Sequence, residues 1–216
     1  MKSKHLMVID PAVKKPAIES YNRIALSSPC AVTYHLPAIH GTTSIKQIQD
    51  NISGIIVMGS ASSVHDNSKW KKFIIELLVK SIDCDVPVMG ICYGHQLLAY
   101  ICGGKVGHLW GGKKEQGCRN VQLKKNPLWG QAMSGPMIFS HQEGVTQCPD
   151  DFKITAVSDM VSVDGFASKT KPIWGFQTHI EATKAFINDH DIQIENPKGA
   201  FDFGHQILDN FIQSLI

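Results

Sequence analysis

The stretch at residues 90–96 constrains the fold of this chain more than any other. Its sequence, Gly-Ile-Cys-Tyr-Gly-His-Gln, follows the apolar run at 86–89 and precedes a helix-like segment. A reactive residue with glycine two positions before it and two positions after it is typical of a nucleophile elbow, a sharp turn from strand to helix. The N-terminus of that helix then lies at the reactive side chain, where it favours an anion. The pattern therefore predicts that Cys92 is a catalytic thiolate nucleophile.

Apolar runs alternate with helix-like segments in the first half of the chain. Strands are predicted at 5–10, 30–36, 54–59 and 86–91, and helices at 16–27, within 41–51 and over 70–78. Asn67 or Ser68 is expected to cap the last of these helices. Continuously apolar strands between helices predict an open, mostly parallel α/β sheet with helices on both faces. Functional residues in such sheets follow the carboxyl ends of strands, as Gly59 and Cys92 do.

The second half of the chain is broken more often by turn residues. Short alternating segments predict further strands, some of them antiparallel, at 105–110, 118–124, 152–157, 161–167 and 172–177. Residues 201–216 predict a closing helix with one apolar face. The polar segment 184–200 has no clear periodicity, so a surface excursion is expected there. Because no repeat or linker divides the chain, one domain over residues 1–216 is expected.

The composition argues against several classes of function. A formal net charge of +2 gives no reason to expect nucleic acid or a membrane surface as a partner. No run approaches the ~18 apolar residues of a membrane span, and the N-terminus lacks a signal-peptide pattern. Six cysteines without a C-x-x-C pair favour free thiols and a cytoplasmic location. The ten histidines show no zinc-ligand spacing, so no metal is expected.

A cysteine nucleophile needs a base close in space and often a third group that orients the base. His179 is the best-placed histidine, because it directly follows the predicted strand at 172–177. Glu181 lies two residues later, so both side chains can face one cleft. Glu181 could then accept a hydrogen bond from the ring nitrogen of His179 that does not face Cys92. The other cysteines are expected to be small core residues, and His95 is expected to pack locally.

Four landmarks in one order resemble class I (triad-type) glutamine amidotransferases. They are the strand and loop at 54–64, the elbow at 90–96, the Ser-His-Gln-Glu segment at 140–143 and the strand with its histidine–glutamate motif at 171–181. The family fold is a flavodoxin-like open sheet of the kind predicted above. The likeness is greatest to the amidotransferase domain of GMP synthetase, and it extends to residues 151–159 and 203–211.

The resemblance implies a role for each matching residue. Cys92 attacks the side-chain amide carbon of glutamine, His179 transfers protons and Glu181 orients His179. The backbone N–H groups of Gly59 and Tyr93 form the oxyanion hole. The thioester is hydrolysed to glutamate, and the step uses no metal or organic cofactor. The residues implied in binding the amino-acid end of the substrate are Gln96, Ser140, His141 and Gln142.

The chain departs from the family pattern at three places near these residues. Ile180 stands where the family usually has proline, and Ser60-Ala61 stand within a phrase that is usually G-G-P-like. Glu143 replaces an aspartate and is one methylene longer. Because the fixed φ of proline is lost, the loops at Gly59 and His179 are expected to be less rigid.

Three functions are compatible with these motifs. The first is a glutamine amidotransferase that releases ammonia. The chain has no room for an ATP-binding synthetase domain, so we expect it to supply a separate synthetase subunit or to act as a free hydrolase. The second is a γ-glutamyl peptide hydrolase, which uses the same triad on a different leaving amine. The third is a non-catalytic regulatory module on the same fold, suggested by the departures at Ile180 and Ser60-Ala61.

Overall fold

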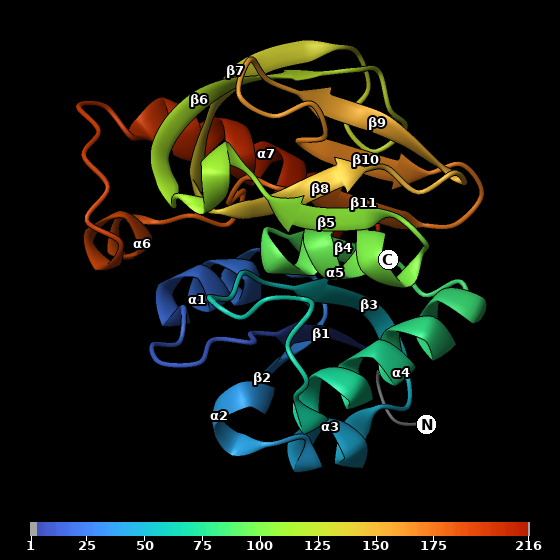
Figure 1. Cartoon of the computed structure of the whole chain (residues 1–216). Helices are drawn as coiled ribbons and strands as arrows, with labels where there is room; N and C mark the ends of the chain where they lie inside the picture. Colours follow the sequence, from blue (N-terminus) through green and yellow to red (C-terminus); the bar gives the residue numbers. More distant parts are fainter. Residues whose placement is uncertain (1–3, 216) are drawn as a thin grey trace.

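A nine-stranded sheet runs through the protein in the computed structural model, which describes residues 4–215 (Figure 1). Its strand order is β2-β1-β3-β4-β11-β10-β9-β6-β7. The parallel part contains β2 (Ala31–His35), β1 (His5–Ile9), β3 (Ile52–Val57), β4 (Val88–Ile91) and β11 (Ile173–Phe176). The structure therefore agrees with the prediction of an open, mostly parallel sheet. The strand β11 brings the segment before His179 alongside the strand before Cys92.

Helices cover both faces of the parallel strands, because neighbouring apolar residues point to opposite sides. Met7 and Ile9 of β1 belong to the core under α3 (Thr43–Ile48), α4 (Lys69–Asp83) and α5 (Tyr93–Ile101). Leu6 and Val8 belong to the core under α1 (Ile18–Ser27) and α7 (Lys198–Gln213). The short helix α2 (Pro37–His40), which was not predicted, contacts α4. Ser68 is the N-cap of α4, but its side chain makes no capping hydrogen bond.

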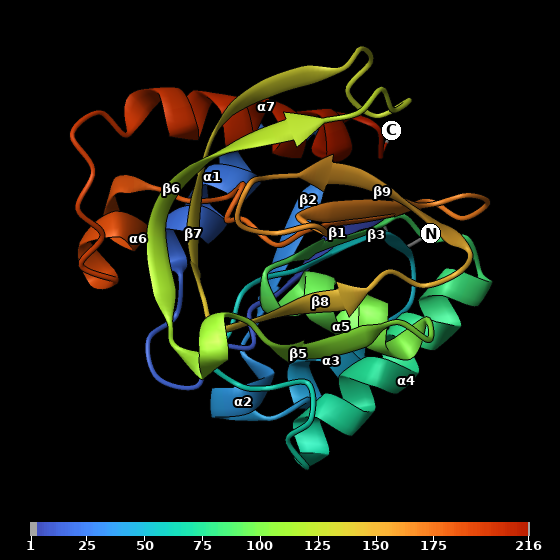
Figure 2. The same ribbon diagram turned by 45° about the horizontal axis from the view of Figure 1, so that its top comes forward.

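The second half of the chain extends the sheet with antiparallel strands, of which β6 and β7 are long and curved in Figure 2. These strands are β6 (Glu115–Leu123), β7 (Met133–His141), β9 (Phe152–Val157) and β10 (Gly165–Ser168). A separate pair joins β5 (Lys105–His108) to β8 (Glu143–Gln147), and a 3-10 turn, η1 (Trp110–Gly112), follows β5. The strands β7 and β8 were not predicted from the sequence, because turn-forming residues such as Pro136 and Gly144 interrupt both. The prediction also started β10 too early, because a turn from Ser158 to Val161 precedes it.

The expectation of a surface excursion over 184–200 is wrong for its first part. Residues Lys184–Asp189 form the helix α6, and the side chain of Thr183 caps it by accepting from the Phe186 N–H. Phe186 and Ile187 are buried in a small third core that also contains Ile138 of β7. The helix was missed because it is only six residues long and its apolar positions do not repeat. Among residues 4–215, no helix has the length and apolar character needed to cross a membrane.

Candidate active site

Cys92 lies at the point where β4 ends and α5 begins, in a strained backbone conformation. Its φ of 51° and ψ of −101° fall where residues other than glycine are rarely found. The flanking glycines make this turn possible. A Cβ on Gly94 would lie 2.1 Å from the carbonyl oxygen of Val57, and a Cβ on Gly90 would lie 2.5 Å from the backbone of Gly94. The chain therefore makes the elbow predicted from the glycine spacing.

His179 and Glu181 follow β11, the strand that lies beside β4. The N–H of Cys92 donates to the carbonyl of Phe176 at 2.8 Å, which joins the two strand ends. His179 Nδ1 lies 2.9 Å from Glu181 Oε1, and both side chains are buried. The end of β3 lies close to both residues, because a Cβ atom on Gly59 would lie 2.7 Å from His179 Cε1 and 3.6 Å from Cys92 Cβ. The carboxyl ends of β3, β4 and β11 thus bring these four residues together.

The surroundings of His179 favour its charged form. Burial by itself lowers the pKa of a histidine, but the Glu181 carboxylate and the sulfur of Cys92 outweigh it, so the pKa of His179 is raised. The ring also packs against Phe186 of α6, with ring centroids 4.3 Å apart. The site therefore favours an imidazolium beside the carboxylate of Glu181.

Two backbone N–H groups beside Cys92 are unengaged. Within residues 4–215, neither the N–H of Gly59 nor that of Tyr93 donates a hydrogen bond to another group. The N–H of Tyr93 belongs to the first residue of α5, where helix amides have no partner inside the helix. Free N–H groups at such a position can stabilise a developing oxyanion. The side chain of Tyr93 instead lies in the core near Trp70.

The loop after Gly59 is held by serine side chains. Ser60 Oγ donates to the carbonyl of Pro11 at 2.7 Å and accepts from the N–H of Ser62 at 3.1 Å. Ser63 Oγ donates to the carboxylate of Glu143 at 3.1 Å. Two of the departures from the family pattern, at Ser60 and Glu143, thus supply hydrogen bonds to this loop. The expectation that the loop at Gly59 is less rigid took no account of these hydrogen bonds.

The loop of His179 is held without proline. Ile180 is fully buried, and a Cβ on Gly204 of α7 would lie 3.0 Å from its Cα. The N–H of Ile180 donates to the carbonyl of Thr178 at 3.2 Å, and the N–H of His179 donates to the carbonyl of Ile138 at 2.8 Å. Packing and backbone hydrogen bonds therefore hold the loop at Ile180, the position where the family that the sequence resembles usually has proline.

A cavity of about 980 Å³ opens above these residues. Cys92, His179 and Glu181 line it together with the loop before α1 and with α6. The four residues expected to bind substrate, which also line this cavity, are Gln96, Ser140, His141 and Gln142. At its rim, Lys15 of the loop before α1 pairs with Asp189 of α6 at 2.5 Å.

The other candidates raised by the sequence lie outside this arrangement. His95 is fully buried and stacks on Phe166 with centroids 4.4 Å apart, and burial lowers its pKa to about 3. The remaining five cysteines are free thiols and do not line the cavity. The expectation that they are core residues is wrong for Cys84 and Cys118, which are exposed, and the other three are only partly buried. In the part of the chain from 4 to 215, no group of histidine, cysteine or acidic side chains is arranged to hold a metal ion.

The model of the family described as glutamine amidotransferase class-I matches residues 17–191. The chain belongs to the class I glutamine amidotransferase family. The glutamine-hydrolyzing GMP synthase of Clostridium novyi is 35% identical over 176 residues, which are 79% of this chain and 30% of that protein. The corresponding enzyme of Phocaeicola vulgatus is 34% identical over 134 residues, 61% of this chain and 25% of that protein. The chain therefore spans about a quarter to a third of the length of these relatives.

A shorter relative and a solved structure are also similar to the amidotransferase. One subunit of the glutamine-hydrolyzing GMP synthase of Methanopyrus kandleri is 28% identical over 146 residues, 66% of this chain and 74% of that protein. A glutamine amidotransferase structure from Thermotoga maritima aligns with a TM-score of 0.71 at 17% identity, covering 98% of this chain and 96% of that one. At that identity the likeness is one of fold. The family and the fold class predicted from the sequence are confirmed.

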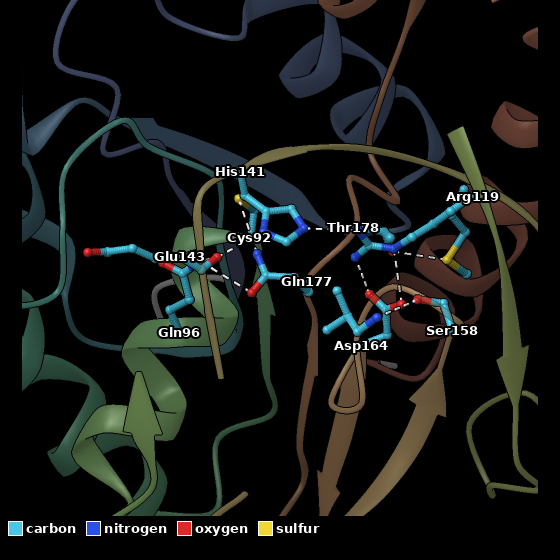
Figure 3. Close-up of polar contacts among 11 residues, drawn as sticks. Cys92, Gln96, Arg119, His141, Glu143, Ser158, Asp164, Gln177 and Thr178 are labelled. Atoms are coloured by element: carbon cyan, nitrogen blue, oxygen red, sulfur yellow. Dashed lines mark hydrogen bonds and ion pairs between the residues drawn. The ribbon is translucent and has the colours of Figure 1, made fainter. Parts of the chain in front are cut away.

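Three buried polar residues of the amidotransferase were not predicted from the sequence, namely Arg119, Asp164 and Gln177, which are shown in Figure 3. Arg119 is on the same face of β6 as the buried Val121 and Leu123. A charged residue on the strand face that carries core residues was therefore a sequence signal for a buried polar group. Gln177 lies within the 171–181 landmark, but the resemblance implied no role for it.

Proposed function

We propose that this chain is a glutamine amidotransferase domain that hydrolyses the side-chain amide of glutamine through Cys92, His179 and Glu181. The observation that carries the proposal is the meeting of three strand ends, with the His179–Glu181 pair at 2.9 Å beside the Cys92 elbow. The raised pKa of His179 supports it, because a protonated imidazole can deliver a proton to a leaving amine.

The proposed reaction has two halves. The sulfur of Cys92 attacks the amide carbon, and the carbonyl oxygen becomes an oxyanion held by the N–H groups of Gly59 and Tyr93. His179 gives its proton to the nitrogen, the C–N bond breaks and ammonia leaves a γ-glutamyl thioester. Neutral His179 then takes a proton from water, which attacks the thioester, and glutamate and the Cys92 thiolate are released. Glu181 keeps the imidazole in position and balances its charge.

The residues expected to bind the amino-acid end of glutamine face the same space. Gln96 donates through Nε2 to the carbonyl of Glu143 and to Gln177, which leaves its Oε1 available to accept from a substrate ammonium group. Ser140, His141 and Gln142 line the same cavity from β7 and the turn after it. We propose no metal or organic cofactor for this step.

We also propose that the ammonia goes to a synthetase on a separate chain. The relative from Methanopyrus kandleri is named as one subunit of a GMP synthase, which supports this arrangement. The longer relatives, named glutamine-hydrolyzing GMP synthases, suggest that this chain and its synthetase together form GMP. Because the reaction needs a reduced thiol, we place it in the cytoplasm.

A second candidate is the hydrolysis of γ-glutamyl peptides. The cavity of about 980 Å³ lies at the upper end of the range of ~300–1,000 Å³ for ligand pockets. It therefore has room for a leaving group larger than ammonia. The chemistry at Cys92 and His179 would be the same.

The test is release of glutamate from glutamine and from γ-glutamyl dipeptides, with and without a purified GMP-forming synthetase. We expect turnover of glutamine by the wild type and a loss of at least about 10⁴-fold in Cys92→Ser. Cys118→Ser is the matched control, because Cys118 is an exposed thiol away from the cavity. Faster turnover of the dipeptides would favour the second candidate. Turnover of neither substrate under either condition would favour a non-catalytic module.

A further inference from the structure

A chain of buried polar contacts connects Cys92 with an ion pair deeper in the protein (Figure 3). The ion pair joins Arg119 of β6 to Asp164, which directly precedes β10. Arg119 Nε donates to one carboxylate oxygen of Asp164 at 3.1 Å, and its Nη2 pairs with the other. Both side chains are almost inaccessible to solvent, at 4% and 0% exposed. Such a pair is well satisfied but costly to desolvate, so its presence in the core calls for a structural or functional reason.

The pair determines which nitrogen of His141 carries a proton. Arg119 Nη1 lies 3.0 Å from His141 Nε2, and a guanidinium group can only donate. His141 Nε2 must therefore accept. Burial and the charge of Arg119 lower the pKa of His141 to about 3, so the ring is neutral and Nδ1 carries its one proton. Nδ1 then donates to the carbonyl oxygen of Glu143 at 2.9 Å.

The carbonyl of Glu143 in turn determines how two glutamine amides are turned. A carbonyl can only accept, so the group of Gln96 that lies 2.8 Å away is its amide nitrogen. The same nitrogen donates to Gln177 Oε1 at 3.3 Å. The nitrogen of Gln177 must therefore face the other way, toward Cys92 Sγ, which lies 3.7 Å away. Both glutamine side chains are buried.

We propose that Gln177 is a catalytic hydrogen-bond donor to the sulfur of Cys92, and that the Arg119–Asp164 pair is the positioning element that sets its direction through His141 and the carbonyl of Glu143. This proposal rests on the proposed function, because it gives Gln177 a part in the same reaction. An N–H group aimed at sulfur stabilises the thiolate more than the thiol. The hydrogen bond therefore activates the nucleophile before substrate binds. It weakens once the sulfur is part of a thioester, because the sulfur then carries no negative charge.

The first test measures the reactivity of the sulfur without any substrate. Iodoacetamide alkylation of the Cys92 peptide is followed by mass spectrometry from pH 5 to pH 10 in the wild type and in Gln177→Glu. The carboxylate has nearly the shape of the amide but no N–H and an unfavourable charge. We expect alkylation at pH 7 to fall about tenfold and the pH of half-maximal rate to rise by about one unit.

Two further variants keep this test decisive. Gln177→Met removes the donor without adding charge, so its shift should have the same direction and a smaller size. Gln122→Glu is the matched control, because Gln122 is exposed on β6, and its profile should equal that of the wild type. Thermal unfolding of each variant checks that the fold is intact. A folded Gln177→Met protein with the wild-type profile would overturn the role of Gln177.

The second test concerns the positioning element. The ¹⁵N chemical shifts of His141, assigned by their loss in His141→Asn, show which ring nitrogen is protonated. We expect protonation at Nδ1 at neutral pH, and protonation at Nε2 would overturn the proposed direction of the chain. The double variant Arg119→Met, Asp164→Leu removes both buried charges together and so avoids leaving one unpaired. It should populate both tautomers and shift the alkylation profile of Cys92 less than Gln177→Glu does.

These outcomes are separable from the proposed function. If the alkylation and tautomer results hold but neither glutamine nor a γ-glutamyl dipeptide is turned over, the proposed reaction fails while the donor role of Gln177 stands. If glutamine is hydrolysed equally well by the wild type and Gln177→Met with identical pH profiles, the donor role fails while the reaction stands.

Discussion

The elbow that carries Cys92 depends on the absence of Cβ atoms at its two glycines, whereas the loops at Gly59 and His179 are held by hydrogen bonds and by the packing of side chains. At the elbow, the missing Cβ atoms of Gly90 and Gly94 allow one tight turn. At the facing loops, the hydroxyl of Ser60 makes two hydrogen bonds, and Ile180 is fully buried beside α7. The difference predicts that the elbow tolerates almost no substitution, while the facing loops can reach the same geometry with different residues.

Gly94→Ala should have the largest effect. Its methyl group would lie 2.1 Å from the carbonyl oxygen of Val57, and neither backbone can move without disturbing β3 or α5. We expect a loss of about 3 kcal/mol or more in the free energy of unfolding. Chemical denaturation measures this loss. An unchanged midpoint would contradict the idea that the elbow has no space for a Cβ atom at residue 94.

Gly199→Ala is the matched control for that change. Gly199 is the second residue of α7, as Gly94 is of α5, but the nearest atom to its added Cβ would be 3.8 Å away. Because alanine is the better helix former, this variant should be as stable as the wild type or up to about 1 kcal/mol more stable.

Glu181→Gln should have the next largest effect, on activity and not on folding. Loss of the charge should lower kcat for glutamine by about 10²–10⁴-fold. The carboxylate is a main cause of the raised pKa of His179, so that pKa should fall in the variant. The protonated acid is then lost at lower pH, and the alkaline limb of the kcat profile should move down the pH scale.

The control for Glu181→Gln is Glu76→Gln, which changes an exposed carboxylate on α4. Its pH profile should match that of the wild type. An alkaline limb that stays in place in Glu181→Gln would mean that Glu181 does not control the protonation of His179.

Ser60→Ala tests the facing loop at Gly59 and should have a smaller effect. The change removes the hydrogen bonds to Pro11 and to the N–H of Ser62, each worth about 1 kcal/mol. We expect kcat to fall roughly fivefold with little change in KM, because the oxyanion donor at Gly59 is less well placed. Ser62→Ala is the control, since within residues 4–215 the hydroxyl of Ser62 makes no hydrogen bond.

Lys15→Ala should have the smallest effect. The Lys15–Asp189 pair crosses the rim of the cavity, but Lys15 is 71% exposed and solvent screens the interaction. We expect less than about 0.5 kcal/mol in stability and at most about a twofold change in KM. A tenfold loss of kcat would show that the rim, and not the interior contacts, holds the facing loops.

Sequence alone was sufficient where a property depends on neighbouring residues. The elbow, the pairing of His179 with Glu181 and the parallel strands all follow from local spacing. The Arg119–Asp164 pair could not be found in this way, because its members lie 45 positions apart and meet only through the order of the sheet. The contacts of Ser60 with Pro11 likewise depend on how two loops approach one another.

The helix α6 shows a further limit of sequence patterns. Its amphipathic face is one turn long, so periodicity could not reveal it. Its contact between Phe186 and His179 depends on the third core, which forms only when β7 and α6 meet.

That third core has a consequence for motion. It is separate from the two clusters that hold the helices against the sheet, and its buried members are few: Ile138, Ala182, Phe186, Ile187, Ile192 and Ala200. A unit with so little buried surface opens at a lower free energy than the strands beneath it. Amide hydrogens of α6 should therefore exchange with solvent well before those of β4. Each such opening removes one wall of the cavity while Cys92 stays in place on the sheet.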